Sequence, residues 1–513
     1  MIHADVLGER ARLSPERCAL VFVPTGERFS YSALNARAER VAAFLRDRLG
    51  LMKGDRVALL ARNRVEYVDL FFAAAKAGLV LVPLGTRLTP HELAFIVRNA
   101  DVSALVYGGD FAETVAAVRT EAAVPRRVAL DDPAAVGDLS WRAELAALPD
   151  APFERTRCGG EDLHLLLYTS GTTGKPKGVM LPHRMVAWNA WNTALCWGYR
   201  EDDVSPVITP LYHAGGLGVA LAPLLAAGGT VLLHEGFDAA EVLATIARER
   251  ATVLFAVPTI WRLLLEHPAF PGTDFASLRW CISGGAPLPL CVIEAWQARG
   301  VVFKQGYGLT EVGVNCFTMS VEESTAKRGS IGRPLMMTDA KLVDESGAEV
   351  PVGEVGELCL RGPHVSKGYW MNPAATAAAL DDDGFFHTGD LARKDADGFF
   401  TIAGRRKDML ISGGMNVYPA EIEGELLLHP SVMDAAVVGV PDPTWGEVGV
   451  AFVVLRPGVG ATKAELLDFA GERLARYKLP REVVFVAEIP RTPYGKVLKS
   501  DLSDTFLAGS GAS

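Results

Sequence analysis

Cysteine is scarce in this sequence and is not arranged in pairs. The 513 residues include seven cysteines, and none of them forms a Cys-x-x-Cys motif. Small secreted domains rely on disulfide frameworks, and structural zinc sites need cysteines and histidines at short, regular spacings. We therefore expect unpaired thiols in a reducing compartment, which favours a cytoplasmic protein.

An excess of positive charge is absent as well. The chain has 51 Lys and Arg residues against 61 Asp and Glu residues, so its formal net charge is −10. Nucleic acids and anionic membrane surfaces attract proteins through a basic field. We expect no nucleic-acid partner, and a small anionic ligand would need a local basic site.

The sequence also lacks the pattern of a signal peptide and a continuous membrane span. The run MIHADVLGERAR has charges where a signal peptide has its apolar core. Residues 204–233 contain no Asp, Glu, Lys or Arg, but Pro206, Pro210 and Pro223 interrupt them. These breakers predict a strand, a loop, a short helix near 216–227 and a second strand. We expect no integral membrane contact.

Helical and β-rich runs alternate through the first part of the chain. For example, Arg56–Leu60 reads as a strand, Glu66–Ala77 as a helix and Leu79–Leu84 as the next strand. This rhythm predicts an α/β fold in which helices cover parallel sheets.

The pattern of predicted helices and strands changes after about residue 330 and again after Arg405. Short strands with glycine-rich turns, at Ala340–Val343, Gly356–Arg361 and Phe399–Ile402, predict a small β-rich subdomain, and a later βα rhythm predicts a small α+β C-terminal domain. The predicted division is an N-terminal domain at 1–404, a C-terminal domain at 409–506 and a disordered tail at 507–513.

The segment Tyr168–Gly178, YTSGTTGKPKG, carries the strongest chemical signal. It follows an apolar run expected to be a strand, and it contains three Gly, one Ser, three Thr and two Lys. Glycine lets backbone N–H groups approach an anion, while hydroxyls and lysines add donors and charge. The pattern predicts a phosphate cradle. It is not a Walker A loop, because Pro176 follows Gly174-Lys175 where that motif has Ser or Thr.

Other familiar catalytic motifs are missing. Ser283 has Cys281 where a G-x-S-x-G elbow needs glycine, and no G-x-G-x-x-G opens a helix after a strand. No H-E-x-x-H motif and no run of clustered Cys and His residues indicates a metal site. The hydrolase, dinucleotide-binding and metalloprotease classes are therefore excluded.

The loop and seven further segments, in order, resemble the motifs of the AMP-forming adenylating enzymes. That superfamily comprises acyl-CoA synthetases, carrier-protein-loading adenylation domains and beetle luciferases. Over the whole chain, the sequence pattern is most similar to that of bacterial fatty-acyl-CoA synthetases. The seven segments are Pro210–Ala214, Ser283–Pro287, Gln305–Glu311, Thr388–Asp390, Gly404–Asp408, Ser412–Glu421 and Pro490–Lys496.

The resemblance implies a ligase that uses ATP, Mg²⁺ and CoA. A carboxylate would attack the α-phosphate of ATP, release pyrophosphate and form an acyl-adenylate, from which a thiol then displaces AMP. The first step brings two anions together, and each unit-charge pair at about 4 Å repels by ~4 kcal/mol at an effective dielectric near 20. Neutralising this charge is therefore the main catalytic task.

The same resemblance implies the residues of the nucleotide site. The phosphate loop would consist of Thr169, Ser170, Gly171, Thr172, Thr173, Gly174 and Lys175. The base and ribose would contact Gly284, Gly285, Ala286, Pro287, Tyr307, Gly308, Asp390, Ile402 and Arg405. The catalytic residues would be Thr310 at the α-phosphate or carboxylate, Glu311 as the magnesium ligand, His213 near the acyl and thiol groups, and Lys496 between carboxylate and α-phosphate.

The acyl pocket implied by the resemblance suits a neutral acid. Malonyl-CoA synthetases of the family have Arg where this chain has Gly306, which disfavours a dicarboxylate. No acid that could hold an amino group lies at His213–Leu217. A medium- or long-chain fatty acid is favoured, an aromatic benzoate or cinnamate is the alternative, and a non-catalytic nucleotide-binding protein is a remote one. The pocket residues would be Tyr212, His213, Ala214, Gly215, Gly284, Gly306, Leu309 and Val314.

The last implied elements serve the second half-reaction. The resemblance implies a hinge at 405–408, where Lys407 matches the family hinge residue, and a C-terminal domain that is mobile about it. Gly413 and Gly414 match the segment beside the thiol arm of CoA. The expected partners are thus a carboxylic acid, ATP and CoA, with a carrier-protein thiol as the other acceptor. The oligomeric state stays open, and a homodimer is one option.

Overall fold

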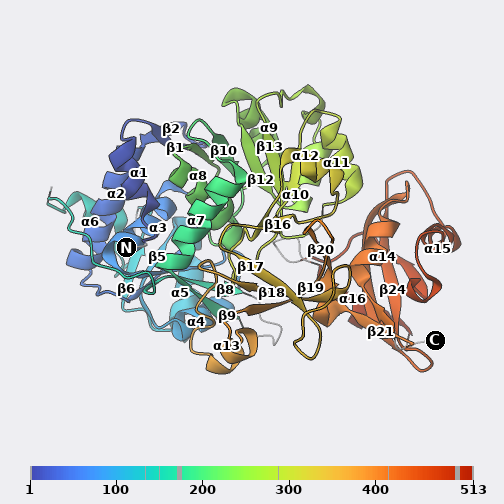
Figure 1. The fold of residues 1–513 in the computed structure, drawn as a ribbon. Coiled ribbons are helices and arrows are strands. Elements are labelled where there is room, and N and C mark those ends of the chain that lie inside the picture. Colours follow the sequence, from blue (N-terminus) through green and yellow to red (C-terminus); the bar gives the residue numbers. More distant parts are fainter. Residues whose placement is uncertain are drawn as a thin grey trace.

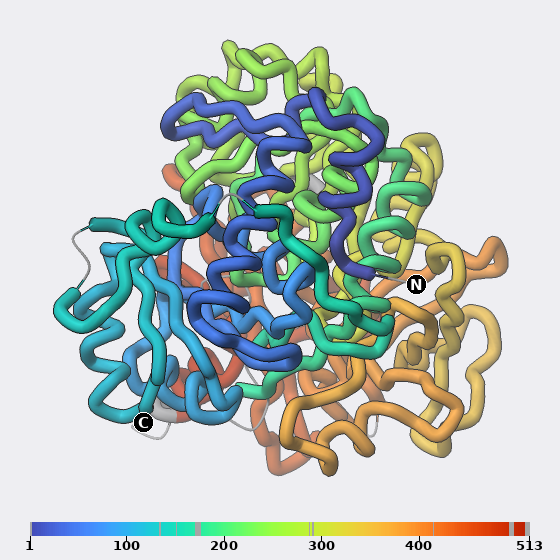
Figure 2. Tube along the Cα trace, turned by 90° about the vertical axis from the view of Figure 1, so that its left-hand side faces the viewer, coloured from blue at the N-terminus to red at the C-terminus, as the bar shows by residue number. Residues whose placement is uncertain are grey.

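This structure is a computed structural model, and it describes residues 3–132, 135–149, 151–169, 176–286, 288–413, 415–491 and 497–510. A large N-terminal region of helix-covered sheets is followed by a smaller C-terminal part (Figure 1). In the side view, the first half of the chain lies in front and the C-terminal part lies behind it (Figure 2). The predicted α/β class is confirmed, while the mobility of the small part stays a prediction.

Several helices begin at the capping signals that their sequences carry. Thr89 and Glu92 form a reciprocal capping box at one helix start, and Thr462 and Glu465 form another. The helices are α1 (Val6–Leu13), α2 (Tyr31–Ala43), α3 (Val65–Ala77), α4 (Pro90–Asn99), α5 (Ala112–Glu121), α6 (Trp141–Ala146), α7 (His183–Trp197), α8 (Ala222–Ala227), α9 (Ala239–Arg248), α10 (Pro258–Glu266), α11 (Leu290–Gln297), α12 (Val321–Ala326), α13 (Pro373–Ala379), α14 (Pro419–Leu426), α15 (Lys463–Gly471) and α16 (Lys499–Ser510).

The largest sheet in the described part of the chain has the strand order β7-β6-β5-β3-β4-β8-β9. Neighbouring strands are parallel except for β9, which pairs antiparallel with β8. The central strands are continuous apolar runs, as strands covered on both faces require. The strands are β3 (Arg56–Leu60), β4 (Val80–Pro83), β5 (Val102–Tyr107), β6 (Arg126–Ala129), β7 (Leu139–Ser140), β8 (Leu163–Thr169) and β9 (Lys177–Pro182).

Two smaller sheets follow, with the strand orders β10-β11-β1-β2 and β12-β13-β14. The uncharged segment 204–233 folds as predicted into β10, a π-helical stretch at Gly216–Leu221, α8 and β11. Within the described ranges, we find no helix with the length and apolar character needed to cross a bilayer. The strands are β1 (Cys18–Phe22), β2 (Glu27–Ser30), β10 (Val204–Val207), β11 (Thr230–Leu233), β12 (Val253–Ala256), β13 (Trp280–Ser283) and β14 (Phe303–Gln305).

The β-rich subdomain is the antiparallel sheet β17-β18-β19-β20, beside a small pair β15-β16. The sequence predicted three of its strands and missed β19, because polar residues and a bulge break the two-residue period there. The strands are β15 (Phe317–Thr318), β16 (Arg333–Pro334), β17 (Asp339–Val343), β18 (Val355–Arg361), β19 (Phe386–Lys394) and β20 (Phe400–Arg405).

The C-terminal part is a sheet of order β22-β21-β24-β23, with β25 added beside β24. The predicted disordered tail at 507–513 is wrong for its first residues, since α16 continues to Ser510. Leu502 and Phe506 pack against the sheet and hold this helix despite its small, polar end. The strands are β21 (Leu410–Ser412), β22 (Met415–Val417), β23 (Val432–Asp442), β24 (Gly446–Leu455) and β25 (Glu482–Phe485).

Three histidines form a column in the N-terminal core. The centroid of the His183 ring lies 4.5 Å from that of His3 and 5.2 Å from that of His164. His183 Nδ1 accepts a hydrogen bond from the backbone N of Ala4 at 3.2 Å, which ties the N-terminal segment to the start of α7. Burial lowers the pKa of His164 and lowers that of His183 to about 3. The two buried rings are therefore neutral at physiological pH.

We expect this column to make the protein less stable in mild acid. An unfolded histidine takes up a proton near pH 6.5, whereas folded His183 stays neutral down to about pH 3. Between these values the unfolded chain binds more protons, so the free energy of unfolding falls as the pH drops below 6.5. Above about pH 7 the column has no effect on this pH dependence.

The substitution His164→Leu tests this expectation, because neither ring nitrogen of His164 has a hydrogen-bond partner in the structure. The slope of the unfolding free energy with pH should decrease by up to ~1.4 kcal/mol per pH unit, measured by urea unfolding between about pH 7.5 and 5. His91→Leu is the matched control, since His91 is an exposed histidine paired with Glu121. An unchanged acid slope in His164→Leu would contradict the assignment.

Candidate functional site

Asp390 lies at the centre of the candidate site, on a bulge in β19. The register between β18 and β19 shifts at this point, and bulges of this kind redirect side chains beside active sites. The buried Asp390 carboxylate accepts a hydrogen bond from the Tyr307 hydroxyl at 2.7 Å and lies 3.2 Å from Nε of Arg405. The fold thus brings together three predicted nucleotide residues from three separate segments.

Packing contacts fix the orientation of the Tyr307 ring. Its ring packs edge-on against Phe317, with 5.6 Å between the centroids and 79° between the planes. Ile402 and Leu309 belong to the same apolar cluster. Burial, and then the negative charge of Asp390, raise the pKa of Tyr307, so its hydroxyl stays protonated and donates to that carboxylate. The predicted stacking of adenine on Tyr307 remains a prediction.

Glu311 follows Tyr307 in the same motif and is half-buried. Its Oε1 accepts a hydrogen bond from the Tyr369 hydroxyl at 3.1 Å. Burial raises the pKa of Glu311, against the hydrogen bond from Tyr369 and the positive charges of Arg405 and Lys177. The Nζ of Lys177 lies 5.1 Å from the centroid of the Tyr369 ring. Tyr369 and Lys177 were not predicted as site residues, although Lys177 lies within the phosphate-loop motif.

The donor set around Glu311 fits a magnesium ion held jointly with phosphate groups. Mg²⁺ prefers oxygen ligands and is usually held by one or two carboxylates together with substrate phosphates. A carboxylate whose pKa is raised by burial regains its charge when a cation approaches. Glu311 could therefore supply the protein ligand, and the ion would neutralise charge on the phosphates.

Some predicted residues lie outside the part of the chain that the structure describes. The strands β8 and β9 flank the phosphate loop, and Thr169 pairs with Lys177 across them. This register brings the two ends of the loop together beside Tyr369. The predicted residues outside the described ranges are Ser170, Gly171, Thr172, Thr173, Gly174, Lys175, Pro287, Gly414 and Lys496.

The predicted adenine-edge turn follows the end of β13. Gly285 has φ +84°, a left-handed conformation that glycine adopts without strain. The Ala286 carbonyl accepts a hydrogen bond from Gln305 at 3.3 Å, which joins this turn to the strand before Tyr307. Gly308 is required for another reason, because a Cβ there would lie 2.3 Å from the backbone of Val314. Gly284 and Gly285 therefore lie beside the start of the Tyr307 segment.

An apolar cavity of about 40 Å³ lies directly beside Thr310. Since one water needs roughly 10–15 Å³ of such space, the cavity is small in this conformation. Of the predicted acyl-pocket residues, Ala214 and Val314 line it. Its other walls come from β8, β9, α7 and α3, and they include Leu167, Met185 and Phe71.

The other predicted acyl-pocket glycines do not border open space. A Cβ at Gly215 or Gly284 would lie within 3.3–3.5 Å of the Phe255 ring or, for Gly215, the His213 ring. A Cβ at Gly306 would lie 3.0 Å from Ile282 and 3.6 Å from Trp197. The role of these glycines in an acyl pocket stays a prediction. Phe255 was missed because its position at the end of β12 carries no motif.

Gly216 has no space for a side chain, because a Cβ there would lie 2.4 Å from the Pro210 carbonyl oxygen. Tyr212 packs near Gly85. The His213 side chain is exposed to solvent, although protein atoms around it desolvate the ring and lower its pKa to about 4. Its Nδ1 accepts a hydrogen bond from Gly215 N at 3.1 Å, so the neutral ring carries its proton on Nε2.

The predicted hinge lies between the last strand of the β-rich sheet and the first strand of the C-terminal sheet. A short 3₁₀ turn at Arg406–Asp408 joins β20 to β21, and Lys407 in this turn is exposed. Gly413 has φ +58°, and a Cβ there would lie 2.8 Å from the Trp445 ring. In this conformation Trp445 therefore covers the glycine that was predicted to face CoA.

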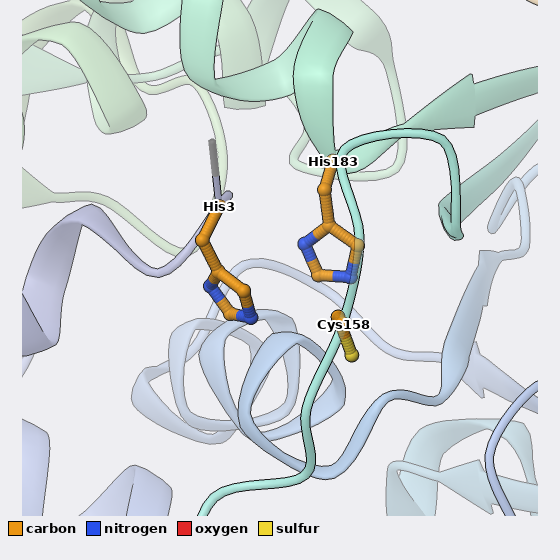
Figure 3. Close-up of side chains that lie close together, drawn as sticks. All are labelled: His3, Cys158 and His183. Atoms are coloured by element: carbon orange, nitrogen blue, oxygen red, sulfur yellow. The ribbon is translucent and has the colours of Figure 1, made fainter. Parts of the chain in front are cut away.

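A second group of donor atoms lies far from this site. Donor atoms of His3, Cys158 and His183 lie within 4.8 Å of one another, and Figure 3 shows the three side chains converging. Both histidines accept a backbone N–H at Nδ1, so each neutral ring has its proton on Nε2. Histidines that bind a metal usually donate from their second nitrogen instead. This arrangement indicates packing, not a metal centre.

The sequence matches the family models for the AMP-binding enzyme over residues 7–370 and for the AMP-binding enzyme C-terminal domain over residues 421–496. It is 42% identical to a feruloyl-CoA synthase of an Amycolatopsis species, over 97% of each chain. It is 38% identical to the long-chain-fatty-acid–CoA ligase FadD13 of Mycobacterium tuberculosis, over 98% of each chain.

Solved structures agree with these relatives. ATP-bound MatB from Rhodopseudomonas palustris superposes with a TM-score of 0.87 at 36% identity, over 98% of this chain and 99% of that one. The anthranilate CoA ligase AuaEII with anthranoyl-AMP gives 0.88 at 30% identity, over 99% of each chain. The motif-based resemblance is thereby confirmed. The chain belongs to the AMP-binding enzyme family and is an enzyme of the AMP-forming ligase class.

Proposed function

We propose that this enzyme is an ATP-dependent acid–CoA ligase that acts on a compact aromatic acid of the cinnamate or benzoate type. The observation that carries the choice of acid is the position of Phe255, whose ring borders the sites of both Gly215 and Gly284. An aromatic ring offers edge and face contacts to another ring.

The similarity to feruloyl-CoA synthase, at 42% identity over 97% of the chain, supports an aromatic substrate. A fatty acid, which the sequence motifs favoured, is the second candidate. The apolar cavity between Thr310 and Phe71 supports it, as does the 38% identity to FadD13. A long chain would have to enlarge this cavity of about 40 Å³.

In the proposed first half-reaction, Asp390 accepts hydrogen bonds from the ribose hydroxyls. Its carboxylate is already oriented by the Tyr307 hydroxyl and Arg405, so little ordering remains when the nucleotide binds. Thr310 lies between the nucleotide motif and the apolar cavity, which suits a contact near the acid carboxylate. Magnesium would supply positive charge at the phosphates when it is bound by Glu311.

In the proposed second half-reaction, the thiol of CoA attacks the acyl-adenylate and AMP leaves. His213 is neutral at physiological pH, since its pKa is about 4. It can therefore donate a hydrogen bond from Nε2 without adding a charge. Access for the thiol beside Gly413 would require the Trp445 side chain to move within the C-terminal part, because both residues belong to that part.

Pyrophosphate release tests the proposed function. We would measure it with ATP and Mg²⁺ across cinnamates, benzoates and fatty acids of rising chain length, each with and without CoA. We expect the highest CoA-dependent kcat/KM with an aromatic acid. A maximum with a long fatty acid would replace the substrate and keep the reaction. Release that CoA does not accelerate would contradict CoA as the acceptor.

Phe255→Ala is expected to widen the acyl pocket. The ratio of kcat/KM for a longer acid to that for the preferred compact acid should rise by about tenfold or more, because pocket contacts of methylene size have effects of this order. Competition between two acids in one reaction measures this ratio directly.

Phe275→Ala is the matched control for Phe255→Ala. Phe275 is a buried phenylalanine that packs on Phe270 and Trp296 in a neighbouring cluster, so its loss perturbs the core without touching Gly215 or Gly284. Equal acid preferences in both variants would remove Phe255 from the acyl pocket.

A further inference from the structure

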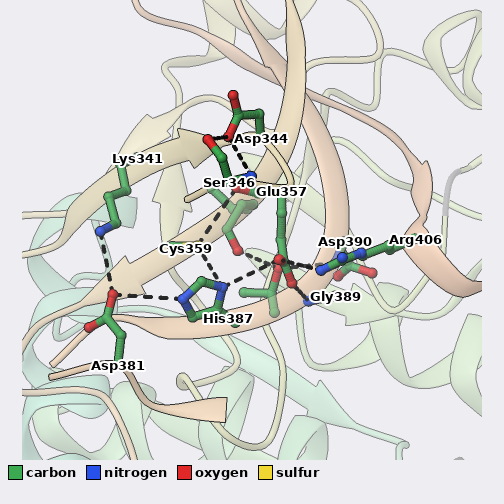
Figure 4. Close-up of polar contacts among 12 residues, drawn as sticks. Lys341, Asp344, Ser346, Glu357, Cys359, Asp381, His387, Gly389, Asp390 and Arg406 are labelled. Carbon is green, nitrogen blue, oxygen red and sulfur yellow. Dashed lines mark hydrogen bonds and ion pairs between the residues drawn. The ribbon is translucent and has the colours of Figure 1, made fainter. Parts of the chain in front are cut away.

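Glu357 on β18 has a buried carboxylate that contacts two functional segments at once. Its Oε1 accepts a hydrogen bond from the backbone N of Gly389 at 3.1 Å, inside the bulge that carries Asp390. Its Oε2 accepts a hydrogen bond from Nη1 of Arg406 at 3.1 Å. Figure 4 shows this carboxylate between the bulge and Arg406. Arg406 lies in the hinge motif Gly404–Asp408 without a role assigned to it there, and Glu357 lies in none of the quoted motifs.

The charges around Glu357 make Arg406 its main cationic partner. His387 Nδ1 lies 3.3 Å from the same Oε2, but its Nε2 faces Asp381 at 3.7 Å, and it is charged only when protonated. The Glu357 side chain is 10% exposed, whereas the Arg406 side chain is 52% exposed. A buried carboxylate that loses its cation is strongly disfavoured. Moving Arg406 away from Glu357 is therefore unfavourable.

Arg406 lies in the turn Arg406–Asp408 that joins the two parts of the molecule. The backbone torsions of this turn must change if the small domain rotates, which would carry the Arg406 side chain out of reach of Glu357. The other carboxylate oxygen of Glu357, Oε1, accepts the hydrogen bond from Gly389 and so stabilises the bulge that contains Asp390. One side chain thus links the shape of the nucleotide bulge to the conformation of the hinge.

We propose that Glu357 is a positioning residue that, through Arg406, holds the small domain in the conformation seen here and so sets the balance between the two half-reactions. This inference rests on the proposed function for its kinetic part. It concerns residues that act through the hinge and the bulge, and neither residue needs to touch substrate.

Two substitutions separate the contacts of Glu357. Glu357→Gln keeps an oxygen that can accept from Gly389 and removes the charge that attracts Arg406. Arg406→Gln removes the cation and leaves Glu357 and its contact with Gly389 in place. Arg406 is exposed, so its replacement keeps the proposal testable even if Glu357→Gln folds poorly. Arg361→Gln is the matched control, because Arg361 also lies on β18 and pairs with Asp339 away from the bulge.

The experiment measures adenylation and, separately, thioester formation from a preformed acyl-adenylate. We expect Glu357→Gln and Arg406→Gln to change the ratio of the two rates in the same direction, by about threefold to tenfold, as a partly exposed ion pair allows. The double variant should change it no further, and the KM for ATP of Arg406→Gln should stay at the wild-type value. Parallel losses in both half-reactions, or additive effects in the double variant, would overturn the proposal.

A readout without substrate separates failure of this inference from failure of the proposed function. Amide hydrogen exchange over residues 405–413 should be faster in both variants than in the wild type and in Arg361→Gln. Wild-type protein that activates no acid, together with this exchange pattern, would reject the function and keep the link between Glu357 and the hinge. Unchanged exchange in Arg406→Gln would reject the link.

Discussion

Replacing Glu311 with Gln is expected to slow adenylate formation by about a hundredfold or more, the size of effect seen when one preorganised electrostatic contact is removed. Gln keeps the shape and can still accept the hydrogen bond from Tyr369, which is 3.1 Å away in the wild type. It cannot supply the negative charge that a magnesium ion requires. The rate of pyrophosphate release at saturating ATP and acid, across a range of Mg²⁺ concentrations, measures the effect.

Tyr369→Phe is the matched comparison for Glu311→Gln. It removes only the hydroxyl that hydrogen-bonds Glu311, so the carboxylate and its charge stay in place. We expect a loss about tenfold smaller than that of Glu311→Gln, with the dependence on Mg²⁺ preserved. Wild-type rates in Glu311→Gln at low Mg²⁺ would rule out Glu311 as the metal ligand.

Lys496→Ala is expected to lower the adenylation rate by about a hundredfold or more, while thioester formation from a preformed adenylate stays within about threefold of the wild type. The family resemblance gives the reason: Lys496 would neutralise charge between carboxylate and α-phosphate in the first step and lie elsewhere in the second. Lys496 is outside the described residues, and the flanking Arg491 and Val497 pair in an antiparallel bridge on the C-terminal part.

Lys499→Ala is the control for Lys496→Ala, since Lys499 lies nearby on α16 and pairs with Glu423 at 2.8 Å. We expect it to leave both half-reactions unchanged. If Lys496→Ala slowed both half-reactions equally, the account in which the small domain uses a different face for each step would be wrong.

Much of the fold was predictable from local pattern. Strand Arg56–Leu60 was predicted with the bounds that the structure has, and the helix and strand after it were placed within a residue or so, because fully buried apolar runs and capped helices leave clear signals. Strand β19 was missed because its bulge interrupts the alternation. The last residues of helix α16, from Leu507 to Ser510, were predicted as tail because they are mostly small or polar and carry no helical pattern of their own.

The residues of the candidate site were also predicted only in part. Tyr307, Asp390 and Arg405 were predicted as nucleotide residues from motifs, and the structure joins them by direct contacts. Tyr369, Phe255 and Glu357 were not predicted as site residues, since none lies in a short motif. Each of them acts on the site through a partner from a distant segment, which no local spacing reveals.

Local sequence motifs were enough to identify the family and the class of reaction, and they predict the nucleotide site. These follow from short segments whose glycines, hydroxyls and charges are dictated by the ligand that they surround. The three-dimensional arrangement was needed to show that the Phe255 ring lies beside Gly215 and Gly284, that the buried histidines stay neutral, and that Glu357 contacts both Gly389 and Arg406. Desolvation, side-chain packing and buried ion pairs depend on which distant elements contact one another in the fold. A short stretch of sequence does not contain that information.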